Sequence, residues 1–155
     1  MQAASDFVSG LPAKTGISLQ RLVLMAASAL GILFGLIPRY TFSSFVSGLL
    51  AMAGESSKPP GYSAFGWIST VVFAVSLALC FLGDRARPVG KLKAAFIATG
   101  GFNLLLGILQ FVIFNSGDYK VLSQYGMGGI GFGLYLLVLM SIVVAAIPFI
   151  KQLEK

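Results

Sequence analysis

Histidine is missing from this sequence, and cysteine occurs once, as Cys80. The absence of histidine excludes a histidine general base and any Ser/His/Asp triad. A single cysteine excludes a disulfide within the chain, and the two shortages together exclude Cys/His metal sites. Acidic residues are scarce as well, with five Asp and Glu in 155 residues. We therefore expect no enzymatic activity, no cofactor and no metal site.

Charged residues are also few, at 10% of the chain, whereas hydrophobic residues make up 57%. A soluble domain carries about 25% charged residues, because its surface must face water. The net charge of +6 comes from Lys and Arg at the edges of apolar stretches. These cations do not form a basic patch with interleaved aromatic residues, the pattern typical of nucleic-acid binding. The composition predicts an integral membrane protein that does not bind nucleic acid.

Four apolar stretches are long enough to cross a hydrocarbon core that is about 30 Å thick. They cover residues 17–37, 64–82, 94–114 and 129–150. Pro38 ends the first stretch, and Pro148 is expected to kink or fray the last turn of the fourth. We predict an all-α membrane protein, a four-transmembrane-helix bundle that forms a single transmembrane domain over residues 1–155.

The distribution of positive charge predicts the orientation, because cytoplasmic loops are enriched in Lys and Arg. On one side lie eight of the 11 basic residues: Lys14, Arg21, Arg85, Arg87, Lys91, Lys93, Lys151 and Lys155. The other side has Arg39, Lys58 and Lys120. We therefore expect both termini to be cytoplasmic, in a plasma or inner membrane.

The cytoplasmic basic loop (Arg85, Arg87, Lys91 and Lys93) can contact anionic lipid heads. Arg21, one turn inside the first stretch, is expected to snorkel to the interface.

The first outer connection, residues 38–63, is the longest. Within it, apolar side chains recur at the spacing of one helical face. They are Phe42, Phe45, Val46 and Leu49. Serines occupy the other face. This pattern predicts a short helix over residues 41–53 that lies in the outer membrane interface.

Small residues recur every four positions in two of the stretches. They are Ala27, Gly31 and Gly35 in the first stretch, and Gly129 and Gly133 in the fourth. Such patterns let helices approach closely in lipid. We favour packing within the chain over a dimer face.

The glycine-rich run at residues 126–133 has no following Lys-Ser/Thr, so we interpret it as a packing element or hinge and not as a phosphate-binding loop.

The third stretch carries two amides and two glycines on one helical face. They are Gly100, Asn103, Gly107 and Gln110. An unpaired amide that faces lipid costs several kcal/mol, so this face should contact protein or a hydrated cavity. Interhelical hydrogen bonding that fixes the packing is the favoured interpretation. A pore lining is the alternative.

These features favour a non-catalytic integral membrane subunit or accessory protein of a larger membrane complex, which acts through helix and loop contacts. Its expected partners are the lipid bilayer and other membrane protein subunits or further copies of itself. One alternative is a small homo-oligomeric pore or passive transporter lined by the third helix. The other is an immunity- or effector-type protein that binds another membrane protein through its outer loops. The spans lack a deeply placed acid, which argues against proton-coupled transport.

Overall fold

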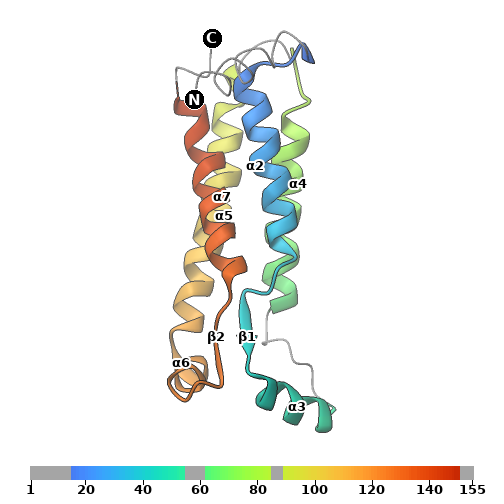
Figure 1. The fold of residues 1–155 in the computed structure, drawn as a ribbon. Coiled ribbons are helices and arrows are strands. Elements are labelled where there is room, and N and C mark those ends of the chain that lie inside the picture. Colours follow the sequence, from blue (N-terminus) through green and yellow to red (C-terminus); the bar gives the residue numbers. More distant parts are fainter. Residues whose placement is uncertain (1–14, 55–61, 85–88, 151–155) are drawn as a thin grey trace, which may run out of the picture.

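Four long helices dominate the computed structural model, which describes residues 15–54, 62–84 and 89–150. They are α2 (Leu19–Gly35), α4 (Tyr62–Leu79), α5 (Lys93–Phe114) and α7 (Phe132–Ala146), and they lie side by side with alternating direction (Figure 1). A 3-10 turn, η1 (Gly90–Leu92), precedes α5, and a second, η2 (Ile147–Phe149), follows α7. The chain is therefore mostly helical, as the sequence predicts.

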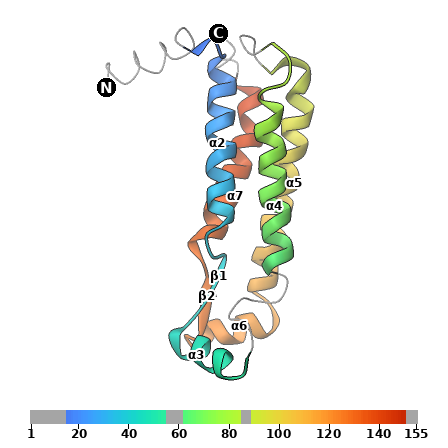
Figure 2. The ribbon, with the colours of Figure 1, turned by 90° about the vertical axis from the view of Figure 1, so that its right-hand side faces the viewer.

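The helices form a ring. α2 packs against α4 and α7, and α5 packs against the same two helices, so α2 and α5 are diagonal to each other. Figure 2 shows this arrangement from the side. The remaining elements gather at one end, which we call the ribbon end: β1 (Tyr40–Phe42), α3 (Ser44–Met52), α6 (Gly117–Gln124) and β2 (Gly128–Ile130). The opposite end holds the start of α2 and the end of α7 (Figure 1).

Two of the described helical segments, Gly90–Phe114 and Phe132–Phe149, are long and apolar enough to cross a membrane. The other two, Leu19–Gly35 and Gly66–Leu79, are apolar but shorter over the described residues. The sequence predicts four spans. Two of them, over residues 94–114 and 129–150, correspond to these two helices, which have the length and composition of a membrane-spanning helix. The 3-10 turn at the end of α7 contains Pro148, whose ring cannot continue an α-helix.

The ribbon end differs from the prediction. β1 and β2 pair antiparallel, with Tyr40 opposite Ile130 and Phe42 opposite Gly128. The predicted interfacial helix over 41–53 is therefore wrong at its start, because residues 40–42 are a strand. The helix begins only after Ser43, whose hydroxyl accepts a hydrogen bond from the Val46 amide at 3.4 Å, a standard N-cap.

The fourth predicted span also starts too early. Gly129 belongs to β2, and α7 begins at Phe132. Gly131 fixes the change of direction: its amide donates to the Arg39 carbonyl at 2.8 Å, and a Cβ there would collide with the Pro38 carbonyl oxygen. α6, which lies between α5 and β2, was not predicted. β1, α3, α6 and β2 thus pack together at one end of the bundle.

Candidate functional site: a polar core inside the bundle

Polar side chains are buried between the helices, while large apolar side chains face outward. The buried set, which we call the polar core, is Gln20, Arg21, Ser28, Arg39, Ser69, Ser76, Asn103, Gln110 and Ser141. The exposed set includes Leu33, Trp67, Val71, Leu105, Ile108 and Leu139. Soluble bundles place these two classes of residue the other way round. Apolar residues still fill much of the interior, among them Leu24, Phe73, Phe96, Leu137 and Val144.

The predicted stripe on α5 faces into the bundle. Gly100, Asn103, Gly107 and Gln110 are all buried. Gly100 lies against the backbone of Ala145, and Gly107 against Val138, so the two glycines set the close approach of α5 to α7. Asn103 donates from Nδ2 to the Ser69 carbonyl of α4 at 3.3 Å. These residues of the stripe therefore contact α4 and α7.

Arg39 is the residue of the polar core that lies at the ribbon end. This side chain is 1% exposed. Its Nη1 donates to Gln110 Oε1 at 3.2 Å, and its Nη2 donates to the Gly35 carbonyl at 3.5 Å. The sequence predicts Arg39 in the connection after the first apolar stretch, and the structure places it there, between α2 and β1, with its side chain buried. The helical spacing of Gly31 and Gly35 does not predict this burial, because α2 ends at Gly35, before Arg39.

At the opposite end of the bundle, Arg21 and Gln20 of α2 hydrogen-bond to residues at the end of α4, before η1 and in η2. Arg21 donates from Nη1 to the carbonyls of Cys80 and Leu82, both at 2.7 Å, and so caps the end of α4. Gln20 donates to the Ile147 carbonyl at 3.3 Å and accepts from the Val89 amide at 3.0 Å. The Arg21 side chain is therefore buried and hydrogen-bonded at the end of α4, and its position at the membrane interface stays a prediction.

The small-residue pattern of α2 also faces inward. Ala27, Gly31 and Gly35 are buried. A Cβ on Gly31 would lie 2.5 Å from the Phe73 ring, and one on Gly35 would lie 2.6 Å from Thr70 Oγ1. Both neighbours belong to α4. In the second pattern, Gly133 is pressed against the Ile37 and Pro38 carbonyls, whereas a Cβ on Gly129 would meet open space.

An aromatic cluster packs the β1–β2 pair, which we call the ribbon, against the bundle. Tyr40 of β1 packs against Phe114 and Tyr119 with ring centroids 5.1 Å away in each case. The Tyr40 hydroxyl donates to the Tyr119 carbonyl at 3.0 Å. Burial is the main cause that raises the pKa of Tyr40 and of Tyr119 above the ordinary tyrosine value. The Tyr40 hydroxyl therefore keeps the proton that it donates at neutral pH.

α3 stands apart from the core. Among its nine described residues none is buried, and it packs against β1. Phe45 is 66% exposed, Leu49 51% and Met52 88%. Phe42 and Val46 are half-buried.

Of the predicted cytoplasmic basic loop, Lys91 is exposed and Lys93 half-buried, while Arg85 and Arg87 lie outside the described residues.

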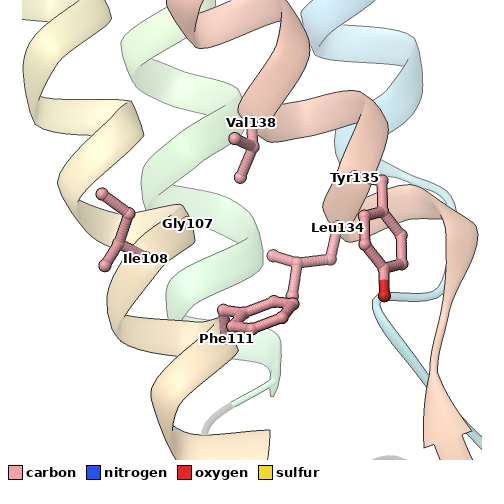
Figure 3. Close-up of a pocket in the computed structure, with 6 residues that line it drawn as sticks. All are labelled: Gly107, Ile108, Phe111, Leu134, Tyr135 and Val138. Atoms are coloured by element: carbon pink, nitrogen blue, oxygen red, sulfur yellow. The ribbon is translucent and has the colours of Figure 1, made fainter.

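A groove of about 200 Å3 runs between α5 and α7 near the ribbon end (Figure 3). Its lining is Gly107, Ile108, Phe111, Leu134, Tyr135 and Val138. The Phe111 and Tyr135 rings meet edge to face, with centroids 6.3 Å apart. Only the Tyr135 hydroxyl is polar in this set, so the lining offers no acid–base pair for catalysis.

Metal-binding groups are not gathered in the part of the chain that the structure describes, where no three His, Cys, Asp or Glu side chains come together. Comparison with protein families, with curated proteins and with solved structures finds no match for this chain. Its role is therefore inferred from the polar core and the ribbon end.

Proposed function

We propose that the chain is a four-span integral membrane protein. One observation carries this proposal: large apolar side chains cover the outside of the bundle, while polar side chains are buried among apolar ones inside. Exposed side chains such as Leu33, Trp67, Val71, Leu105 and Leu139 are compatible with lipid, whereas contiguous apolar surface is a liability in water. Inside, both arginines and the amides of Gln20, Asn103 and Gln110 hydrogen-bond to other segments of the chain, as expected where no water is present. The hydroxyls of Ser28 and Ser69 have no hydrogen-bond partner among the described residues.

The shorter helices fit the same proposal. The 17 residues of α2 rise about 25 Å, which is close to the thickness of a hydrocarbon core. Gln20 lies in the first turn of α2, and Arg39 lies four residues past its end. The basic residues favour the ribbon end outside and both termini in the cytoplasm.

Within that membrane, the chain acts as a non-catalytic subunit or accessory protein of a larger complex. α3 supports this role, because its exposed Phe45, Leu49 and Met52 fall at i, i+4 and i+7 on a helix that has no buried residue. α3 follows β1 and lies beyond the end of the four long helices (Figure 1). We assign the face to another membrane protein, which would cover it as a helix in a groove.

A homo-oligomeric pore is less well supported. The amides Asn103 and Gln110, which would have to line it, are buried within a single chain and hydrogen-bonded to Ser69 and Arg39. Exposing them between copies would require breaking those contacts.

Gentle detergent extraction of the full chain, followed by mass spectrometry, tests the proposed role. We expect fixed stoichiometry with at least one other membrane protein. Phe45→Ser combined with Leu49→Ser should abolish this association while membrane insertion is unchanged. Gly48→Ala is the matched control, because it lies on the same helix and its new Cβ would meet open space.

A double variant that retains the same partner would contradict the assignment of α3 and would leave its apolar face to lipid. Wild-type protein that is isolated alone and conducts ions in liposomes would overturn the subunit proposal.

A further inference from the structure

The groove between α5 and α7 lies in the half of the bundle nearest the ribbon end (Figure 3). Gly107 is seven residues before the end of α5, and Tyr135 is three residues after the start of α7. At a rise of 1.5 Å per residue, the groove extends from about 5 Å to about 10 Å inside the ends of the two helices. In a four-span membrane protein, this depth belongs to the hydrocarbon core just below the interface.

The groove opens to the outside of the bundle. Ile108, Phe111 and Tyr135 in its lining are exposed, whereas Gly107 and Leu134 are buried. An apolar hollow that stays empty loses the dispersion contacts of its lining. At this depth its occupant therefore comes from the bilayer or from another membrane protein.

The dimensions of the groove favour a single hydrocarbon chain over a helix of another protein. The lining covers one turn of each helix, residues 107–111 of α5 and 134–138 of α7, which is about 6 Å of length. A helix with its side chains is about 10–12 Å across, and a stable protein interface buries about 800 Å2 on each partner. A hollow of about 200 Å3 is too small for such an interface.

The chemistry of the lining indicates which chain fits. Tyr135 contributes the only polar side chain. Its hydroxyl points toward the ribbon end in Figure 3, and it makes no hydrogen bond to the residues that the structure describes. A tyrosine hydroxyl can donate one hydrogen bond, and the ester carbonyls of membrane lipids lie at the boundary that this hydroxyl faces. No charged side chain belongs to the lining, so the groove does not select among headgroups.

We propose that the α5–α7 groove binds one acyl chain of an ester-linked membrane lipid, and that the Tyr135 hydroxyl donates a hydrogen bond to the ester carbonyl of that chain. The apolar lining recognises the chain, the hydroxyl recognises the ester, and the headgroup stays outside the groove. This inference rests on the proposed membrane location and not on the partner proposed for α3.

Native mass spectrometry of the purified full chain in detergent, titrated with dioleoyl phosphatidylcholine, tests the site. We expect one lipid to bind more tightly than any further lipid. Ile108→Trp should weaken this first binding by at least about tenfold, because the larger side chain overfills the groove. Leu105→Trp is the matched control, since it adds the same side chain at an exposed position of α5 outside the lining, and it should keep the wild-type affinity.

The role of Tyr135 is tested with the diether analogue of the same lipid, which has the same chains and no ester carbonyl. The wild type should bind the diester about fivefold more tightly, the effect of one hydrogen bond. Tyr135→Phe should bind both lipids equally. Tyr125→Phe removes an exposed hydroxyl at the same end of the bundle, outside the lining, and should keep the preference. Phosphatidylglycerol with the same chains should bind as tightly as phosphatidylcholine.

Equal lipid binding by Ile108→Trp and Leu105→Trp would overturn the proposal, and so would a wild type that does not prefer the diester or that selects lipids by headgroup charge. If Ile108→Trp removes a co-purifying protein and leaves lipid binding unchanged, a side chain of that protein fills the groove and the proposal is wrong. Failure of the membrane location itself is a different result, in which alkaline carbonate releases the chain from membranes.

Discussion

Replacing Gly100 with valine is expected to prevent the bundle from folding. A Cβ at this position would lie 2.6 Å from the backbone nitrogen of Ala145 and 2.9 Å from its Cβ. These atoms belong to α7 and cannot rotate away as the end of a flexible side chain can. Overpacking a core costs about 1–3 kcal/mol even where side chains can adjust, so a clash between two helix backbones should cost more. Size-exclusion chromatography of the detergent-extracted protein should show loss of the monodisperse species.

The neighbouring glycine provides the control. A Cβ on Gly101 would meet no atom within 4 Å, so Gly101→Val makes the same change one residue along the same helix. Helix propensity and hydrophobicity change equally in both variants. If Gly100→Val and Gly101→Val behave alike, α5 and α7 do not pack as described.

The second large effect is expected for Arg21→Met. Arg21 donates two hydrogen bonds of 2.7 Å to the carbonyls that end α4. Hydrogen bonds that involve a charged group contribute about 1.5–3 kcal/mol each, so the loss of both should lower the free energy of unfolding by about 3 kcal/mol or more. Methionine keeps much of the length and helix propensity of the side chain. Reversible unfolding in mixed micelles, titrated with a denaturing detergent, measures the difference.

Arg21→Lys separates charge from geometry. An ammonium group keeps the charge but lacks the fork of a guanidinium, so the loss should be intermediate. Hydrogen exchange should rise in the segment around Cys80 and Leu82 for Arg21→Met before it rises elsewhere. Wild-type stability in Arg21→Met would show that Arg21 does not cap α4.

The long helices could be predicted because each leaves a long signal in the sequence. The sequence predicts the third apolar stretch at residues 94–114, and α5 covers Lys93–Phe114. Its stripe was found for the same reason: Gly100, Asn103, Gly107 and Gln110 repeat at a helical period. What these residues contact, such as Ser69 and Ala145, depends on the tertiary arrangement and leaves no local pattern.

The ribbon could not be predicted in this way. Each strand has three residues, and β2 contains two glycines, so neither shows the alternation of a strand. The pairing joins Tyr40 to Ile130, which are 90 positions apart. The contacts of the two arginines could not be predicted for a different reason. A count of charges assigns Arg21 and Arg39 to opposite ends of the bundle, but it does not show that their partners are buried carbonyls and an amide.

The most direct test of the account is the accessibility of the two ends of the bundle in intact cells. In a Cys80→Ser background, Ser123→Cys places a thiol on α6 at the ribbon end, and Lys91→Cys places one on η1 at the opposite end; both positions are exposed. A membrane-impermeant maleimide should label Ser123→Cys in intact cells and Lys91→Cys only after permeabilisation. Equal labelling of both positions before permeabilisation, or release of the chain from membranes by alkaline carbonate, would contradict a membrane-spanning bundle with its ribbon end outside.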